Sequence, residues 1–342
     1  MALPLSALAR FFDLLAFVGV VGALSWRLWV LPARDEPARP DRCQRGWPRI
    51  RVMLFAAIAG LTITTPLLLL MRAGEMGRQT LAGAVPLVPK VLAGSHYGSV
   101  WKVRAAALVV LWVWVFWRGI GKGPAAVMWV AMLAIGWTYS ASGHASAWGD
   151  FSLAQLIDGM HVASTAIWVG GVLVLATAAR PLFLTGQDRA YALEAAERLS
   201  RLAGLALLGV VLTGTYNAVT QIGFVSALWE TAYGRLLLLK LAGVLGVAGL
   251  GAWNRYRGLR GLRDWAACPP GPRTVRSAGE RFLRIATLES FLVVWVLGCT
   301  AVLGGAMPPR EASRTEGHHA VTVTSSRSLE GADKAREAET EG

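Results

Sequence analysis

Eight long apolar stretches run through the sequence, and they constrain its fold more than any motif does. A helix of about 20 predominantly apolar residues is long enough to cross the hydrocarbon core of a bilayer. A segment in lipid must also satisfy its own backbone N–H and C=O groups, which a helix does and an open strand does not. We therefore predict an all-α, polytopic membrane helix bundle. Its eight transmembrane helices are expected at approximately residues 8–31, 50–71, 100–117, 124–143, 153–178, 200–222, 235–254 and 283–305.

The composition favours a membrane protein over a nucleic-acid-binding one. Charged residues make up 16% of the chain, whereas soluble domains contain about 25%. The 15 tryptophans suit membrane interfaces, where this residue is enriched. The net charge of +13 arises from arginines in gaps between apolar stretches, without the interleaved aromatic residues of single-strand binders. Membrane lipid is therefore an expected partner, and no nucleic-acid partner is expected.

The positions of lysine and arginine predict the orientation. The loops at 32–51 and 255–284 carry the largest numbers of these residues, and the loops at 144–152 and 223–234 carry none. Short cytoplasmic loops are enriched in lysine and arginine, so the odd-numbered loops are predicted to be cytoplasmic. We therefore expect a multi-pass protein of the bacterial inner (plasma) membrane with both termini periplasmic.

Polar residues within the apolar stretches repeat, which predicts two related halves. Because each half has an even number of helices, both enter the membrane in the same direction, a parallel four-plus-four repeat. The first half covers residues 1–140, the second covers 150–305, and a disordered extracytoplasmic tail covers 306–342. His318 and His319 in that tail are interpreted as solvated residues with weak metal affinity at most. The repeat pairs Asp13 with Asp158, Tyr97 with Tyr233, Gly98 with Gly234, and Arg104 with Lys240.

Histidines gather at the predicted outer face. His161 lies in the fifth apolar stretch, about 12 Å deep at 1.5 Å per residue, where an ionisable group is costly and marks a functional site by default. Asp158 and Thr165 share its helix face, at i−3 and i+4. His144 precedes this helix, and His96 precedes the third helix. We therefore predict a metal site formed by His144, His161, Asp158 and His96.

Copper is the metal that this ligand set suits best. Imidazole and thioether ligands favour copper, above all Cu(I), and a carboxylate beside a histidine fixes the tautomer that leaves one ring nitrogen free to bind. Structural alternatives stay open: His144 as a solvated loop residue, Asp158 as a helix cap, and the methionines as packing residues. The methionines near the outer face are Met71, Met76, Met160 and Met307.

Other polar residues of the spans are harder to interpret. Thr213 and Asn217, near the outer end of the sixth helix, either line a cavity or form hydrogen bonds across helices. Arg104 and Lys240 are expected to extend their charged ends outward to the interface. Glu289, near the cytoplasmic side of the last helix, is expected to pair with a nearby arginine or with Asn254.

Several short motifs, weak singly, are specific in combination. They are Ser142-Gly143-His144-Ala145, Asp158-x-x-His161 followed by Trp168-Val169-Gly170-Gly171, Thr213-Gly214 with Asn217, TAYGRLLLLK at 231–240, Trp253-Asn254-Arg255, and Arg284 through Glu289. With them the chain resembles the bacterial copper resistance protein D (CopD-like) family. The resemblance covers most of residues 50–305 and is densest over 139–305.

The resemblance implies an eight-helix protein that takes copper across the membrane or toward the cytoplasm, often alongside a periplasmic, copper-binding CopC-like protein. It also implies functional roles for His144, Asp158 and His161. We therefore expect copper ion transport, in the uptake direction, with copper ion as the bound or transported species and no enzymatic activity. Two alternatives stay open: a b-type haem membrane redox protein, and an assembly factor that delivers copper to a membrane oxidase.

Overall fold

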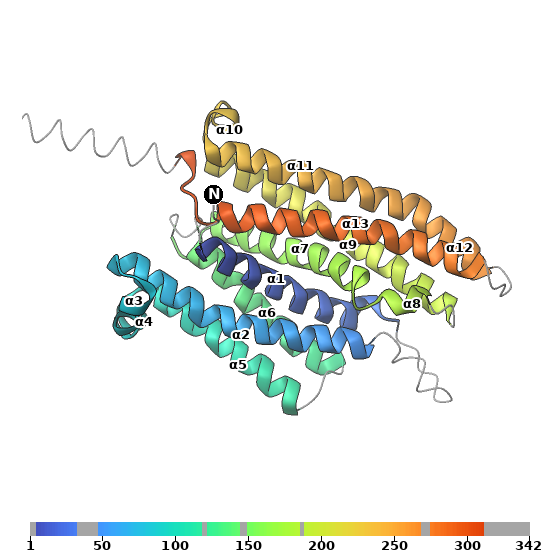
Figure 1. Ribbon diagram of the computed structural model, residues 1–342, viewed down its shortest axis with the longest axis horizontal. Helices are drawn as coiled ribbons and strands as arrows, with labels where there is room; N and C mark the ends of the chain where they lie inside the picture. The colour runs from blue at the N-terminus through green and yellow to red at the C-terminus, as the bar shows by residue number, and fades with distance from the viewer. Residues whose placement is uncertain are drawn as a thin grey trace, which may run out of the picture.

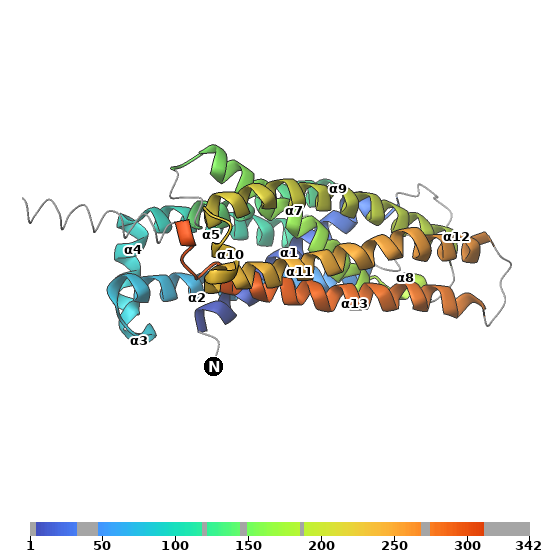
Figure 2. The ribbon, with the colours of Figure 1, turned by 90° about the horizontal axis from the view of Figure 1, so that it is seen from above.

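The computed structural model describes residues 5–32, 47–117, 122–143, 149–184, 188–267 and 274–310, and every regular element among them is helical (Figure 1). Eight helices are long and apolar enough to cross a membrane, which confirms the predicted number of spans. They are built on α1 (Leu5–Ser25), α2 (Trp47–Gly77), α5 (His96–Trp117), α6 (Lys122–Ser142), α7 (Leu153–Ala176), α9 (Arg189–Ile222), α11 (Ala232–Trp253) and α13 (Thr274–Leu303). The long helices run along one common axis in both ribbon views (Figures 1 and 2).

Short helices occupy the connections. α3 (Leu81–Ala84), α4 (Val88–Gly94) and α10 (Ala227–Glu230) lie at one end of the bundle, and α8 (Arg180–Leu184) and α12 (Leu259–Ala267) lie at the other (Figure 1). Thr80 caps α3 by accepting a hydrogen bond from Gly83 N at 3.4 Å. A π-helical turn, Trp26–Val30, continues α1, and a second, Asn254–Gly258, joins α11 to α12. Residues 72–99, which separate the second and third predicted spans, thus contain the short helices α3 and α4.

Two spans, α9 and α13, begin well before the apolar stretches that predicted them, and α13 begins at Thr274 instead of near residue 283. α9 begins at Arg189 instead of near residue 200, because Asp188 caps it by accepting from Tyr191 N at 3.0 Å. The added turns are amphipathic: Ala192, Ala195 and Ala196 are buried, while the side chain of Glu194 is partly exposed. An apolar-length criterion detects only the part of a helix that lies in lipid, so it misses such extensions.

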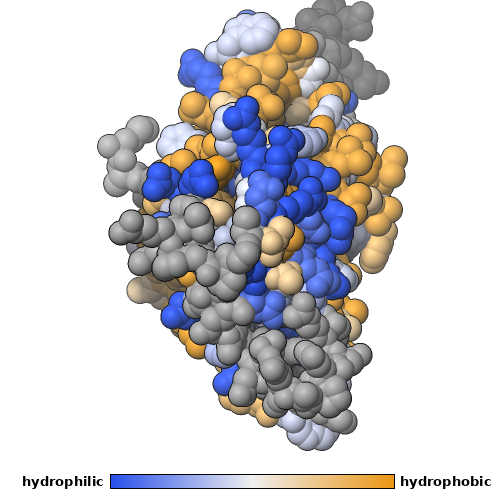
Figure 3. Space-filling model, turned by 90° about the vertical axis from the view of Figure 1, so that its right-hand side faces the viewer, coloured by the Kyte–Doolittle hydropathy of each residue, from blue (hydrophilic) through white to orange (hydrophobic). Residues whose placement is uncertain are grey.

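Hydrophilic residues gather at one end of the bundle (Figure 3). Figure 3 looks onto the end formed by α8 and α12, where hydrophilic residues gather and apolar residues flank them. These short helices contribute Arg180, Arg260 and Arg263. We refer to this as the arginine-rich end and to the other as the opposite end. The arginines of α8 and α12 thus share one end, and the cytoplasmic location of that end stays a prediction.

α1 is the central helix and the most deeply buried of the candidate spans. It packs against α2, α6, α7 and α13, and α7 in turn packs against α6, α9 and α13. α1 and α7 cross at Gly22 and Gly170, where a Cβ on Gly22 would lie 2.4 Å from the Gly170 carbonyl oxygen. Small residues at a crossing let two membrane helices approach at backbone distance, so these glycines set the centre of the bundle.

We expect Gly170→Ala to destabilise the protein by about 1–3 kcal/mol through overpacking. The added Cβ would lie 2.2 Å from the Val18 carbonyl oxygen, so α1 and α7 must separate. Gly298→Ala on α13 is the matched control, because a Cβ there meets nothing within 4 Å. Thermal unfolding of both variants in detergent checks this. Equal midpoints for Gly170→Ala and the control would contradict the assigned crossing.

Candidate functional site

The start of α7 is anchored by hydrogen bonds at the opposite end of the bundle. Ser152 caps the helix by accepting from Gln155 N at 3.2 Å. Ser140 on α6 donates to the Gln155 carbonyl at 2.8 Å, which ties α7 to α6. Gln155 itself is fully buried. These contacts fix the register of α7, so that Asp158 and His161 follow within the next turns on the side facing α9.

The His161 ring is held in one tautomer by α9. Its Nδ1 lies 3.0 Å from Thr213 Oγ1, and the same hydroxyl donates to the Gly209 carbonyl at 2.5 Å. A hydroxyl has only one proton, so Thr213 Oγ1 must accept from Nδ1–H. The lone pair of the neutral ring therefore resides on Nε2, one of the two imidazole atoms that bind metals.

Asp158 is held by the same helix. Asn217 Nδ2 donates to Asp158 Oδ1 at 2.8 Å, which confirms hydrogen bonding across helices as the role of Asn217. Since Asn217 lies one helical turn from Thr213, the two α9 side chains meet Asp158 and His161 along one seam. Gly214 leaves room for the ring, because a Cβ there would lie 3.0 Å from His161 Cε1. We call these five residues the α7–α9 polar seam.

A cation on α11 lies near this seam. The charge of Lys240 interacts electrostatically with Asp158 and with the His161 ring. The charge of Asp158 thus partly balances that of a lysine within a membrane span. A metal ion that binds Asp158 and His161 must compete with Lys240 for the same negative charge.

His96 begins α5 at the same end of the bundle but is exposed and packs elsewhere. Its Nε2 lies 3.1 Å from the Ala141 carbonyl oxygen, and its Nδ1 lies 3.7 Å from Asp150 Oδ2. Ala141 and Asp150 flank segment 144–148 in the sequence, and His144 lies in that segment, outside the described residues.

The four predicted site residues are therefore only partly placed. Asp158 and His161 share the α7–α9 polar seam, whereas His96 contacts the end of α6 and Asp150. Among the described residues no group of three or more His, Cys, Asp or Glu side chains is close enough to hold a metal ion. The joint site stays a prediction, as does the interpretation of the tail residues His318 and His319, which also lie outside the described part.

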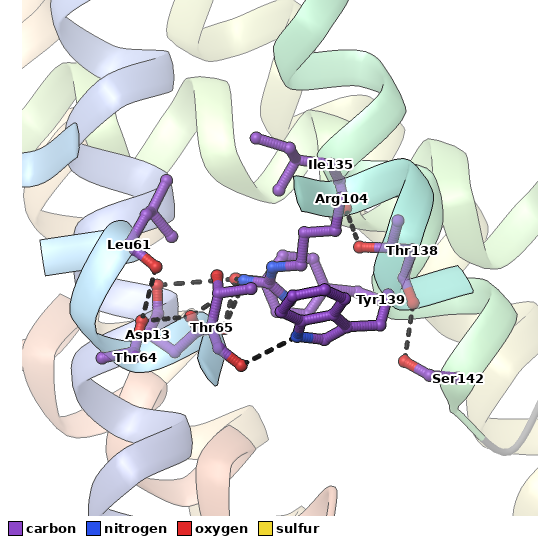
Figure 4. A network of polar contacts seen from close by, with 10 residues as sticks. Asp13, Leu61, Thr64, Thr65, Arg104, Ile135, Thr138, Tyr139 and Ser142 are labelled. Carbon is purple, nitrogen blue, oxygen red and sulfur yellow. Dashed lines mark hydrogen bonds and ion pairs between the residues drawn. The ribbon is translucent and has the colours of Figure 1, made fainter. Parts of the chain in front are cut away.

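A second polar centre, in the first half of the chain, was not predicted from the sequence (Figure 4). Arg104 Nη2 donates to Asp13 Oδ1 at 2.8 Å and to Oδ2 at 2.7 Å. Tyr139 OH donates to Asp13 Oδ2 at 2.6 Å and accepts from Arg104 at 2.9 Å. Thr64 donates to Asp13 Oδ1 at 2.5 Å. We call these four residues the Asp13 network.

The Asp13 network shows that the predicted position of the Arg104 side chain was wrong. Arg104 does not extend outward to the interface: its side chain is 9% exposed and that of Asp13 is 1% exposed. The internal repeat already pairs Asp13 with Asp158 and Arg104 with Lys240. A polar partner for Arg104 could therefore have been inferred from the repeat, although the contributions of Thr64 and Tyr139 could not.

Comparison with known proteins identifies the family. Residues 1–151 match the family model described as copper resistance protein D-like, N-terminal domain, and residues 193–303 match the model described as copper resistance protein D. The chain belongs to the copper resistance protein D family. As a member of this family it is a copper resistance or copper transport membrane protein with multiple transmembrane helices.

Two curated relatives are similar to this copper resistance protein D family member. One is copper resistance protein D of Pseudomonas syringae pv. tomato, 28% identical over 278 residues, which cover 75% of this chain and 83% of that protein. The other is copper transport protein CutJ of Bacillus subtilis (strain 168), 29% identical over 206 residues. That match covers 56% of this chain and only 37% of CutJ. No solved structure matches the chain significantly.

Proposed function

We propose that this protein takes up copper across the inner membrane and that Asp158 and His161 form its binding site within the membrane. The observation that carries the proposal is the His161 tautomer. The hydrogen-bond chain from Nδ1 through Thr213 to the Gly209 carbonyl leaves Nε2 with a lone pair inside a transmembrane span. A neutral imidazole oriented by its other nitrogen is the usual arrangement of a histidine that binds a metal.

The proposed path begins at the opposite end of the bundle. His96 and His144 receive copper there and pass it to Asp158 and His161. Each position offers few ligands, so copper exchanges between weakly binding sites instead of being retained at one tightly binding site. Soft and borderline donors such as imidazole suit copper over the harder cations that prefer oxygen ligands. In this proposal a periplasmic CopC-like protein delivers the copper.

The interaction of Lys240 with Asp158 favours transient over permanent copper binding. The charge of Lys240 acts on Asp158 when copper is absent, so the carboxylate is balanced in the empty state. When copper binds Asp158, it replaces Lys240 as the positive charge that balances the carboxylate. When Lys240 interacts with Asp158 again, copper release is favoured. The driving force comes from the copper gradient, an acceptor inside, or the membrane potential, which contributes about 2.3 kcal/mol per charge per 100 mV.

The orientation and the repeat belong to the same proposal. The arginine-rich end is taken as cytoplasmic by the positive-inside rule, which places both termini and the α7–α9 polar seam toward the periplasm. The packing pattern supports a parallel repeat of residues 1–140 and 150–305. α1 packs on α2 as α7 packs on α9, and α5 packs on α6 as α11 packs on α13.

Thr213→Val tests the proposal at the residue that orients His161. Valine keeps the shape of threonine but cannot accept from Nδ1–H, so the ring loses its fixed tautomer. We expect copper affinity of the purified protein to fall about 10–100-fold, as is typical when a ligand loses its orienting partner. Competition with a chelator of known copper affinity measures this.

Thr215→Val on the same helix is the matched control. Thr215 is exposed, and its hydroxyl donates only to the Val211 carbonyl of its own helix, at 2.8 Å. Unchanged copper affinity in Thr213→Val would remove the argument for His161. An absorption spectrum of the same wild-type sample addresses the haem alternative, because a Soret band would contradict the copper proposal.

A further inference from the structure

The buried carboxyl group of Glu289 lies outside the α7–α9 polar seam and forms no ion pair with a cationic side chain among the described residues. It is on α13, between Ala278 and Leu303 of the last span and nearer to Ala278. The residue is 5% exposed, and its Oε1 is buried without a hydrogen-bond partner. A carboxylate in such a position would be an unpaired charge in a low-dielectric interior, which is strongly unfavourable.

The neighbouring side chain of Asn254 also has a buried oxygen without a hydrogen-bond donor. The carboxyl group of Glu289 lies beside the side-chain amide of Asn254, and Asn254 Oδ1 is also buried without a donor. Asn254 Nδ2 contacts the Phe282 carbonyl at 3.5 Å. Two adjacent groups therefore present acceptor oxygens that no described donor satisfies.

The backbone around Asn254 leaves space beside its side-chain oxygen. Asn254 opens the π-helical turn Asn254–Gly258, and such turns often occur at functional positions. A Cβ on Gly258 would lie 2.2 Å from Asn254 Oδ1, so glycine leaves space around the amide oxygen. The same turn leads directly to α12 and the arginine-rich end (Figure 1).

Charged groups on the elements that pack against α13 are engaged elsewhere. Arg180 on α8 donates to Thr287 Oγ1 at 2.9 Å and to the Ala176 carbonyl at 3.4 Å. Other charged side chains on these elements also have partners: Arg255 contacts the Ser200 carbonyl, Arg257 lies over the Trp253 ring, Arg263 on α12 pairs with Glu197, and Asp13 on α1 pairs with Arg104. Lys240 on α11 interacts electrostatically with Asp158 on α7. None of these interactions neutralises Glu289.

We propose that Glu289 and Asn254 form a proton-binding site in the half of the bundle nearer the arginine-rich end. The proton resides on Glu289, whose O–H donates to Asn254 Oδ1 while an Asn254 N–H faces the remaining carboxyl oxygen. One proton thereby satisfies both unpartnered oxygens and removes the buried charge. The ligand is a proton and not copper, because the site provides only oxygen atoms and no imidazole or sulfur donor of the kind that copper prefers.

Coupling of this site to transport rests on the proposed function. A proton released from Glu289 toward the arginine-rich end compensates the charge of an entering cation, so copper uptake responds to the internal pH. We expect uptake by Glu289→Gln to lose this pH dependence while copper binding at Asp158 and His161 stays unchanged.

Infrared spectroscopy of the purified, copper-free protein tests the proton site independently of transport. At neutral pH we expect the carbonyl band of a protonated carboxylic acid, lost in Glu289→Gln and retained in the control Glu230→Gln, which changes an exposed carboxylate on α10. Asn254→Leu should shift the band instead of removing it, because the acid loses its acceptor.

These measurements distinguish failure of the proton site from failure of the proposed function. An acid band that is the same in wild type and Glu289→Gln, or one unaffected by Asn254→Leu, would overturn the proton site. So would loss of one bound copper per chain in Glu289→Gln. If the bands behave as expected but wild-type protein moves no copper, the proposed function fails and the proton site stands.

Discussion

Cells that produce His161→Ala should accumulate no more copper than cells that lack the protein. The substitution removes the imidazole of His161, which lies within a membrane span. Its Nδ1 is hydrogen-bonded to Thr213, so its Nε2 carries the lone pair that can bind copper. His96, the other histidine in the described residues, lies at the end of its helix. We expect the affinity of the site to fall by more than the roughly 100-fold that loss of an orienting partner can cost. Cellular copper measured by elemental analysis checks this.

Correct insertion must be shown for the His161 result to count. Leu156→Ala changes an exposed side chain on α7, one turn before Met160, and should leave accumulation unchanged. Both variants should unfold at similar temperatures, since His161 is only partly buried and its described polar contacts with α9 are confined to Thr213 and the Val210 backbone. Accumulation by His161→Ala equal to wild type would place the copper path elsewhere.

Breaking the Asp13 network should have the largest effect on stability. Asp13→Leu leaves Arg104 buried without its carboxylate, and removing one partner of a buried pair costs about 3–5 kcal/mol. Arg104→Met leaves the opposite charge unpaired and should be similarly harmful. The double variant Asp13→Leu/Arg104→Met removes both charges and should recover most of the loss, because an apolar pair of similar volume suits the interior.

Thermal and chemical unfolding of the two single variants and the double variant form a complete cycle. The account predicts strong non-additivity, with the double variant more stable than either single one. Additive losses would mean that Asp13 and Arg104 act independently, contrary to their bonds at 2.7 and 2.8 Å. Copper accumulation by the double variant should resemble wild type, since Asp158 and His161 are untouched.

The fold was predictable as far as bilayer thickness determines it. Each span needs enough apolar residues to cross the hydrocarbon core, and that requirement is visible in the sequence. The polar extension of α9 back to Arg189 and the helices α3 and α4 were missed because caps and tertiary contacts decide them. The crossing at Gly22 and Gly170 was equally invisible, because it depends on two segments far apart in the chain.

The candidate site was predictable only along single helices. Asp158 and His161 are three residues apart on α7, so their common face follows from helical periodicity. Their hydrogen bonds to Asn217 and Thr213 depend on how α7 packs against α9, which periodicity does not determine. The pairing of Arg104 with Asp13 was missed because a cation near a helix end is compatible both with an interface and with a buried partner.

Copper uptake into proteoliposomes tests the central claim most directly. Purified wild-type protein is reconstituted into vesicles that contain a trapped copper chelator, and internal copper is followed over time. We predict accumulation that continues well beyond one copper per chain and is absent from vesicles with His161→Ala. Copper that binds once, in proportion to the protein, and does not increase with time would contradict transport and favour a copper-delivery role.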